Sequence, residues 1–593
     1  MKPYPQARIR NVAVIGHGGT GKTSLVEAAL FATKAIDRLG RVDEGTATTD
    51  FDPEEVRRKH TVNLALAPLE WADHKINIVD APGYPDFIGE VVCALRVAEA
   101  AIVVVDGVAG VQVQAEKGWA MAAEAGLARM VVINRLDREN SSFTRILESL
   151  QGRLPGHMVP VQIPIGAEGN FRGVVDLLSM KAFGQDGNPG EIPMEVAEDA
   201  RAWRDRLVEA AAECDDALVE KYLEGTDLTP QEVVEGLRKG VQAGQVAPVL
   251  CASAVKGIGV APLLDTIVSL VPAPDVAAPK GKHARTGEAM TLKSSPDGPL
   301  AALVFKTMAD PYVGKLSYFR VYSGTLPADS QVYNASKDKM ERVGTVFHLR
   351  GKHQEPTNQV VAGDIGAVAK LAETETGHTL CAKDHPVLLD PINFPRPIIA
   401  MAVEPKSKGD EDKMGQALHR LTEEDPTFHV HRDTEMKQTV ASGMGEAHLE
   451  IMMERLKRKF GVDVTLTLTR VPYREAIRGT AKDQGRYVRQ SGGRGQYGVC
   501  FLEVAPLPRG SGLEFVDKIV GASIPNQFIP SVEKGVKRAS EEGVLAGYPI
   551  VGVRVTLFDG KHHPVDSSDI AFQIAGSMGF KEAVQQAGLA LLE

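Results

Sequence analysis

A glycine-rich segment near the amino terminus carries the residue types that bind phosphate. It matches the pattern GxxxxGK[ST], whose glycines let backbone N–H groups curl round phosphate oxygens. The lysine supplies a point charge for the β- and γ-phosphates, and the next hydroxyl can bind Mg²⁺. An ordinary glycine-rich turn is the alternative, but the segment lies between an apolar strand and a helix. The predicted phosphate-binding residues are Gly16, His17, Gly18, Gly19, Thr20, Gly21, Lys22, Thr23 and Ser24.

Two later positions complete a predicted site for the γ-phosphate. Asp80 opens the sequence DAPG after an apolar run, where it can hold Mg²⁺ through water while the Gly83 N–H senses the γ-phosphate. Thr61 follows a charged segment, residues 53–60, that would become ordered when γ-phosphate and Mg²⁺ offer Thr61 a ligand position. Alternatively, Thr61 does no more than lead into a strand. The predicted metal ligands are Thr23, Thr61 and Asp80, and the predicted catalytic residues include Lys22 and Thr61.

A third set of residues predicts which nucleotide base the site binds. A carboxylate at Asp137, in the sequence NRLD, can accept both guanine N1–H and the exocyclic amine, a pair of donors that adenine lacks. A backbone N–H near Ser253 and Ala254 can meet guanine O6. Singly these motifs are weak, but their order on successive strands favours GTP or GDP over adenine nucleotides. The predicted guanine-site residues are Asn134, Arg135, Asp137, Ser253 and Ala254.

These motifs require a particular framework. Short apolar, β-branched runs at residues 11–15, 75–80, 101–106 and 130–134 alternate with helical stretches. Buried strands separated by helices predict a largely parallel sheet, and each motif follows one strand. Ligands bind at that edge of open α/β sheets.

The remaining chain divides by pattern. Residues 155–247 read as an insertion with a helix over 194–223, and residues 272–299 read as a linker. Residues 300–385 alternate strands with glycine turns and predict a small β-barrel. Residues 396–470 predict a split βαβ plan with helices at 413–423 and 446–459, and residues 471–593 a further α+β unit.

The ordered motifs identify the chain as similar to elongation factor G. The sequences GHGGTGKTS, DAPGxxDF, NRLD and CASA resemble its first domain, and FKTMADPYVGKLSYFRV its second. SGMGEAHLE resembles the third domain, and RQSGGRGQYG and DSSD the fourth. The resemblance implies a multidomain fold: an α/β P-loop GTPase domain with an insertion, a β-barrel, then two α+β domains, ferredoxin-like and ribosomal-S5-like. The expected domains are 1–275 (insertion about 155–247), 295–388, 396–470 and 471–593.

The family's activity is GTP-dependent movement of tRNA and messenger RNA through the ribosome, with Mg²⁺ as cofactor. Its fourth domain reaches the decoding site through two loop tips. A solvated hairpin is the alternative for these loops here, and a metal site at the adjacent histidines is disfavoured because neighbouring loop residues rarely ligate together. The predicted RNA-facing residues are Ser491, Gly492, Gly493, Arg494, Gly495, Gln496, His562 and His563.

The sequence departs from the family at four places. Tyr84 stands where the family has the histidine that positions attacking water, and Tyr84 becomes a possible catalytic residue. Gly19 replaces an aspartate thought to help hold a monovalent cation, and Arg135 replaces a lysine whose stacking on guanine it can take over. The chain stops at Glu593, where the family has another small domain, so we expect a fragment or a shortened form. Tyr84 and Gly19 together resemble a divergent second-paralogue subgroup.

The net charge and the cysteine content limit which partners and which cellular compartment we expect. The net charge of −10 argues against general coating of nucleic acid, although residues 474–494 carry a local charge of +4 that a solvated face would also explain. Five scattered cysteines fit a reducing cytosol, and no apolar run approaches the ~18 residues of a membrane span. We expect a cytoplasmic monomer whose partner is the ribosome with its ribosomal RNA, tRNA and mRNA.

Three rival functions remain. The chain could serve ribosome recycling or antibiotic protection, which use the same motifs. It could also be a GTP-loaded ribosome occupant that hydrolyses slowly, because Tyr84 and Gly19 weaken the chemistry. A phosphate-loop kinase would prefer ATP, and Asp137 argues against it.

Overall fold

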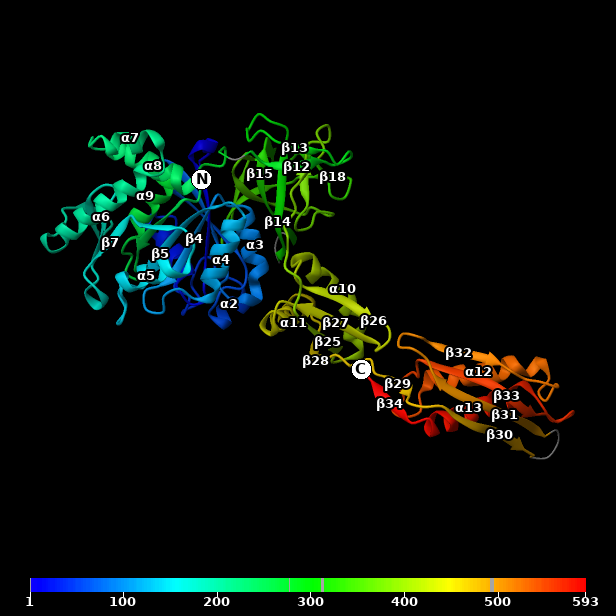
Figure 1. Cartoon of the computed structure of the whole chain (residues 1–593). Helices are drawn as coiled ribbons and strands as arrows, with labels where there is room; N and C mark the ends of the chain where they lie inside the picture. Colours follow the sequence, from blue (N-terminus) through cyan, green and yellow to red (C-terminus); the bar gives the residue numbers. More distant parts are fainter. Residues whose placement is uncertain (1, 277, 311–313, 491–494) are drawn as a thin grey trace. The chain divides into compact units, whose positions relative to one another are not determined.

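The protein forms two compact units, which are described separately. The computed structural model describes residues 2–593 except 277, 311–313 and 491–494 (Figure 1). The first unit contains Met1–His431 and Thr439–Thr467, and the second contains Arg432–Gln438 and Leu468–Glu593.

A seven-stranded sheet forms the centre of the first domain. Its order is β2-β3-β1-β4-β5-β11-β6, and every neighbouring pair is parallel except β2 with β3. The predicted strands are present, and the sheet adds an antiparallel edge strand, β2, that the sequence reading missed. The bounds are β1 (Ile9–Gly16), β2 (Ala65–Trp71), β3 (His74–Asp80), β4 (Ala100–Asp106), β5 (Ala128–Asn134), β6 (His157–Pro160) and β11 (Val246–Cys251).

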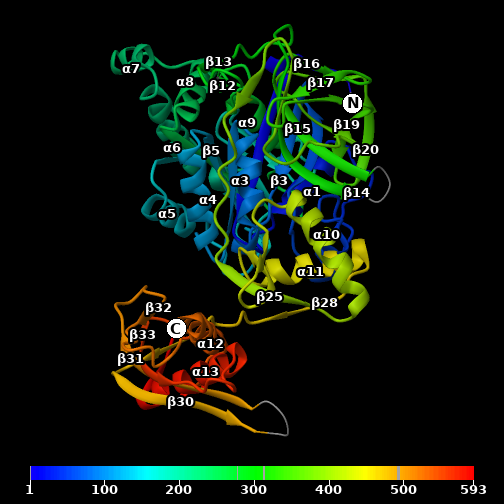
Figure 2. The ribbon, with the colours of Figure 1, turned by 90° about the vertical axis from the view of Figure 1, so that its right-hand side faces the viewer.

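Helices cover both faces of this sheet, as Figures 1 and 2 show. Alternate residues of one strand enter opposite cores: Ala13 and Ile15 pack with one set of helices, Val12 and Val14 with the other. The first set is α3 (Ile88–Arg96), α4 (Val113–Glu124) and α5 (Phe143–Arg153); the second includes α1 (Lys22–Ala32) and α9 (Val260–Leu270). Burial on both faces explains the continuous apolar runs in the strands.

The insertion has its own sheet and helices. The sequence predicted one helix over 194–223, but the structure has two, because Asp215 caps a new helix by accepting a hydrogen bond from the Ala217 N–H. The elements are β7 (Gln162–Ile165), β8 (Gly173–Asp176), β9 (Lys181–Gly184), β10 (Pro189–Gly190), α6 (Met194–Ala212), α7 (Asp216–Leu223) and α8 (Pro230–Gln242).

The second domain is built of antiparallel strands. Part of the predicted linker at 272–299 is structured: β12 pairs with β13 and with β24. The main sheet has the order β18-β17-β23-β14-β15-β22-β19-β20, and β16 pairs with β21. The bounds are β12 (Lys280–His283), β13 (Ala289–Thr291), β14 (Ala301–Asp310), β15 (Gly314–Ser323), β16 (Thr325–Pro327), β17 (Gln331–Asn334), β18 (Lys339–Arg342), β19 (Val346–Arg350), β20 (His353–Thr357), β21 (Gln359–Val361), β22 (Ile365–Ala369), β23 (Thr379–Cys381) and β24 (Val387–Leu389).

The third domain has the predicted βαββαβ order. Its sheet runs β26-β27-β25-β28, with α10 and α11 packed on it. Helix α10 begins five residues before the predicted start of 413 because Ser407 caps it through the Asp410 N–H. The bounds are β25 (Ile399–Pro405), α10 (Lys408–Glu424), β26 (His429–Asp433), β27 (Gln438–Gly443), α11 (Glu446–Phe460) and β28 (Val464–Thr467).

The second unit is the predicted further α+β domain. The sheet β30-β31-β33-β32 packs one face against two helices, and β29 pairs with β34. Glu475 fixes the loop before β33 by accepting hydrogen bonds from the N–H groups of Val544, Leu545, Ala546 and Tyr548. The bounds are β29 (Arg474–Ile477), β30 (Ala481–Arg489), β31 (Gln496–Pro506), β32 (Leu513–Asp517), α12 (Ile529–Glu542), β33 (Val553–Lys561), α13 (Asp569–Gln586) and β34 (Leu589–Leu592).

Candidate functional site

The phosphate loop connects β1 to α1. Gly21 precedes the helix with φ 86°, a left-handed conformation that glycine adopts without strain, so the first N–H groups of α1 open towards the loop. Lys22 is buried, and its Nζ donates to the carbonyls of Gly16 (3.2 Å) and His17 (2.8 Å). Burial lowers the pKa of Lys22 to about 8. A buried ammonium held over the loop is placed to meet phosphate oxygens.

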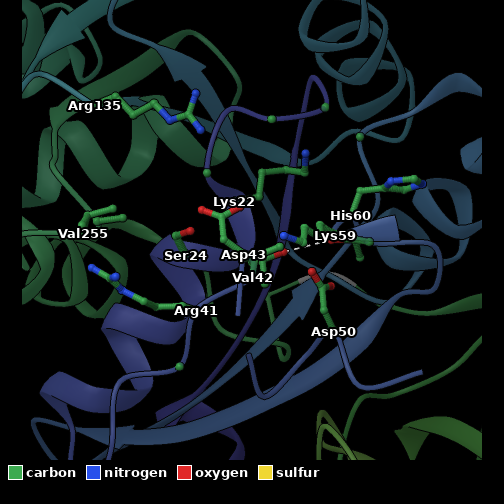
Figure 3. A pocket seen from close by; sticks show the side chains of 18 of the residues that line it. Lys22, Ser24, Arg41, Val42, Asp43, Asp50, Lys59, His60, Arg135 and Val255 are labelled. Carbon is green, nitrogen blue, oxygen red and sulfur yellow. Dashed lines mark hydrogen bonds between the residues drawn. The ribbon is translucent and has the colours of Figure 1, made fainter. Parts of the chain in front are cut away.

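A cavity of about 390 Å³ lies over this loop. In Figure 3, Lys22 lies near its middle, with Arg135 and Val255 towards one end and Asp50 and His60 towards the other. The predicted residues that line it are Gly18, Gly19, Gly21, Lys22, Thr23, Ser24, Thr61, Gly83, Tyr84, Arg135 and Ala254.

The segment before β2 lines the end of the cavity at which Asp50 and His60 lie. Helix α2 (Pro53–Arg58) starts with a capping box between Asp52 and Glu55. The Glu55 carboxylate also accepts hydrogen bonds from the N–H groups of Val62 (3.0 Å) and Asn63 (2.9 Å). This clamp holds Thr61, whose hydroxyl lies 3.0 Å from the hydroxyl of Thr23. The two predicted metal-binding hydroxyls are therefore brought together.

Buried carboxylates surround these hydroxyls. Asp80 accepts a hydrogen bond from Thr49 Oγ1 (2.7 Å) through Oδ2, while its Oδ1 and both oxygens of Asp50 are buried with no hydrogen-bond partner among the described residues. Burial, reinforced by the facing carboxylate Asp80, raises the pKa of Asp50 to about 7. Burial raises the pKa of Asp80 to about 6. Asp50 was not among the predicted site residues.

Unpartnered carboxylate oxygens beside two hydroxyls fit Mg²⁺, which prefers oxygen ligands. Across the described part of the chain, no group of three or more His, Cys, Asp or Glu side chains is arranged as a metal site. Mg²⁺ does not need one, because it is held by one or two carboxylates together with phosphate oxygens and water. Asp80, Asp50, Thr23 and Thr61 are the residues that could hold it.

Gly83 lies where DAPG meets the phosphate loop. A Cβ at this position would collide with Lys22 Nζ and lie 2.6 Å from the Gly18 N atom. The Gly83 backbone therefore lies against Lys22 and the phosphate loop, and a larger residue would displace Lys22.

The guanine end is organised by Asn134 at the end of β5. Its Nδ2 donates to the Thr20 carbonyl (2.9 Å), and its Oδ1 accepts the Ala254 N–H (3.0 Å). The Ala254 amide, predicted to meet guanine O6, is thus engaged with Asn134 in this structure. Arg135 donates to Asp106 Oδ2 (2.8 Å). Asp137 is half-buried, and its carboxylate has no hydrogen bond or ion pair within the described chain, which leaves it available to a base.

Helix α11 of the third domain lies against α2. Buried Arg455 donates from Nη2 to Asn63 Oδ1 (2.8 Å) and to Asp52 Oδ2 (3.3 Å). Arg458 donates from Nε and Nη2 to the two carboxylate oxygens of Glu54 (2.8 and 2.9 Å). Burial works to raise the pKa of Asp52, but Arg455 and Arg458 hold it below its usual value. The segment that carries Thr61 is therefore tied to the third domain by charge.

Described residues at or next to the two predicted RNA-facing loops lie side by side in the second unit. The Gly495 N–H donates to Asp566 Oδ1 (3.0 Å), and the Tyr497 N–H donates to the Asp566 carbonyl (2.8 Å). His563 is half-exposed beside Tyr497, with ring centroids 6.0 Å apart. His562 is exposed and Gln496 begins β31. Ser491, Gly492, Gly493 and Arg494 lie outside the described residues.

Comparisons with known proteins cover nearly the whole chain. Residues 7–273 match the model of the elongation factor Tu GTP binding domain, and residues 299–383 match elongation factor G domain 2. Residues 394–468 and 469–588 match domains III and IV of elongation factor G. The chain belongs to the elongation factor G family. A crystal structure of a Thermus thermophilus protein is similar, with 37% identity and a TM-score of 0.81, covering 99% of this chain and 86% of that one.

An aromatic residue of this elongation factor G family member lines the phosphate cavity. Tyr84, for which the resemblance led us to expect a histidine, is 44% exposed, and a Cβ at Gly18 would lie 3.0 Å from its ring. Glycine at position 18 thus makes room for the tyrosine. Gly19 has φ 79° and open space around it.

The first domain of this elongation factor G family member matches the GTP-binding domain model, and GTP or GDP is the ligand this match implies. None of the described helices combines the length and the apolar character needed to cross a membrane.

Proposed function

We propose that this chain is a ribosome-stimulated GTPase of translation elongation, which couples GTP binding and hydrolysis to movement of tRNA and mRNA. The observation that carries the proposal is the meeting of Lys22, Thr61 and Gly83 at one phosphate cavity, in a chain that also matches the second, third and fourth domains of elongation factor G. Mg²⁺ would be held by Thr23, Thr61 and Asp80, with Asp50 beside them. The ribosome would be the partner of a cytoplasmic monomer.

The direct test measures multiple-turnover GTP hydrolysis with and without ribosomes, together with displacement of mRNA on ribosomes that carry a peptidyl-tRNA in the A site. Stimulated hydrolysis with mRNA displacement supports translocation. Stimulated hydrolysis that instead splits ribosomes or releases an antibiotic would favour the recycling or protection alternatives.

A slowly hydrolysing ribosome regulator is the second candidate, and Tyr84 is the observation that favours it. A phenol can orient water but carries no positive charge near the developing phosphate charge. GTP-dependent ribosome binding with hydrolysis no faster than in the absence of ribosomes would support this candidate.

The switch segment gives a separate prediction. Arg57, Arg58 and Lys59 are tryptic sites two to four residues before Thr61. Because γ-phosphate and Mg²⁺ stabilise the closed segment, a GTP analogue with Mg²⁺ should slow cleavage there about tenfold relative to GDP, which needs ~1.4 kcal/mol of differential binding. Cleavage after the exposed Arg509 of the second unit serves as the control. Equal rates in both nucleotide states would remove the switch from the proposal.

Tyr84 substitutions test the chemistry at the cavity. Most of phosphoryl-transfer catalysis is positioning and charge stabilisation, so a water-orienting residue modulates the rate without abolishing the reaction. Tyr84→His should raise the ribosome-stimulated rate, and Tyr84→Phe should lower it roughly tenfold. GTP affinity should change little in either variant. A parental rate in Tyr84→Phe would mean that the ring merely packs.

A further inference from the structure

We infer that His60 is a second positioning residue at the phosphate cavity, which together with Tyr84 holds the water that attacks GTP. The inference deepens the proposed GTPase function and rests on it. His60 directly precedes Thr61 and lines the cavity, and neither its type nor its place in the sequence marked it as a site residue.

The two rings approach each other across the cavity from different segments. His60 comes from the switch segment that follows α2, and Tyr84 from the DAPG loop, yet their ring centroids are 4.7 Å apart with planes inclined by 49°. The Tyr84 ring also lies on Gly18 of the phosphate loop. The histidine–tyrosine pair therefore lines the same cavity as Lys22 and Gly83.

The hydrogen bonding of His60 determines which of its two ring nitrogens can accept a hydrogen bond in the cavity. Its Nδ1 lies 3.1 Å from the carbonyl oxygen of Arg58, at the end of α2. A carbonyl accepts and never donates, so Nδ1 carries the proton in this contact. Nε2 has no hydrogen-bond partner within the described chain and is not fully buried. In the neutral ring Nε2 is an acceptor, while the Tyr84 hydroxyl can both donate and accept.

The His60–Tyr84 pair can hold the attacking water by two hydrogen bonds, whereas Tyr84 alone could offer only one of them. A water molecule between the two side chains would donate one proton to Nε2 and accept a hydrogen bond from the phenol, which leaves a lone pair for the phosphorus atom. The closed switch segment brings His60 into place together with Thr61, so the water would be held when the segment is closed and not when it is open.

Three substitutions at position 60 separate hydrogen bonding from packing. His60→Asn keeps a donor at the Nδ1 position and removes Nε2. His60→Gln places an amide oxygen near the Nε2 position, and His60→Phe keeps the ring against Tyr84 without any nitrogen. The full-length variants are compared by ribosome-stimulated turnover and by affinity for a fluorescent GTP analogue.

We expect His60→Asn and His60→Phe to lower the maximal turnover rate about tenfold or more, with the GTP-analogue affinity and the KM for ribosomes within about twofold. His60→Gln should recover most of the rate. In a double-mutant cycle with Tyr84→Phe, the losses should be less than additive because both residues hold one water.

A parental rate in His60→Phe would overturn the inference and assign the ring to packing. A rate loss in all three variants that is matched by weaker GTP binding would also overturn it, because the histidine would then act by ordering the switch segment. If the unmodified protein shows no ribosome-stimulated hydrolysis, the proposed function itself fails, which is a different result from equal rates among active variants.

Discussion

Replacing Asp137 with asparagine is expected to lower GTP affinity by about 10- to 150-fold and to improve binding of xanthosine triphosphate. In our proposal Asp137 accepts two guanine donors, and loss of a charge-assisted pair costs ~1.5–3 kcal/mol. Xanthine has a carbonyl in place of the exocyclic amine, and the asparagine amide can donate to it. The carboxylate is half-buried with no partner in the described chain, so its substitution disturbs no internal contact.

Equilibrium titration with fluorescent GTP and XTP analogues measures both changes. Glu139→Gln is the matched control, because it removes a carboxylate from the same loop at an exposed position. The control should bind GTP within about twofold of the parent. Asp137→Asn with unchanged GTP affinity would show that another group recognises the base.

Replacing Arg455 with methionine is expected to free the switch segment from the third domain. The substitution removes the buried cation that pairs with Asp52 and leaves that carboxylate with Asn63 (3.0 Å) and the less buried Arg458 (3.3 Å) as partners. It also leaves Asn63 Oδ1 without its donor. Breaking a buried pair by removing one member costs ~3–5 kcal/mol. Amide hydrogen exchange at Val62 and Asn63, which Glu55 holds, should accelerate by about 100-fold or more if opening of the segment controls exchange.

Arg57→Ala is the control for this variant. Arg57 of α2 pairs with Glu454, which neighbours Arg455 on α11, but the Arg57 side chain is 59% exposed. Exposed ion pairs contribute ~0–1 kcal/mol to stability. Exchange at Val62 should therefore change far less in Arg57→Ala. If Val62 and Asn63 exchange at the parental rate in Arg455→Met, Arg455 does not hold the segment closed.

The nucleotide loops could be predicted from the sequence because their chemistry is local. The phosphate loop needs glycines, a lysine and a hydroxyl close together in the chain, and a strand and a helix on either side fix its direction. The strand bounds were also predictable, since a parallel sheet covered on both faces leaves continuous apolar runs. The predicted guanine-site residues Asn134 and Ala254 come together in the structure because β5 and β11 are neighbours in the sheet.

The sequence-based predictions of helix and linker bounds were wrong where a single residue or a distant strand determines the structure. A single capping aspartate, Asp215, divides the helix predicted over 194–223, and composition alone does not distinguish a cap from a solvated acid. The proline-rich segment before the barrel contributes strand β12 because β24, much later in the chain, pairs with it, and β13 pairs with the other edge of β12.

Asp50, His60 and Arg455 belong to the site through tertiary structure alone. In the sequence, Asp50 and His60 are polar residues in a charged stretch, and Arg455 is one of several basic residues on an amphipathic helix. Their roles depend on burial and on partners that are distant along the chain: Asp80 beside Asp50, Tyr84 beside His60, and Asp52 beside Arg455. Sequence motifs specify groups that must contact phosphate and base, whereas the desolvation and pairing that give these other side chains their character arise when separate segments pack together.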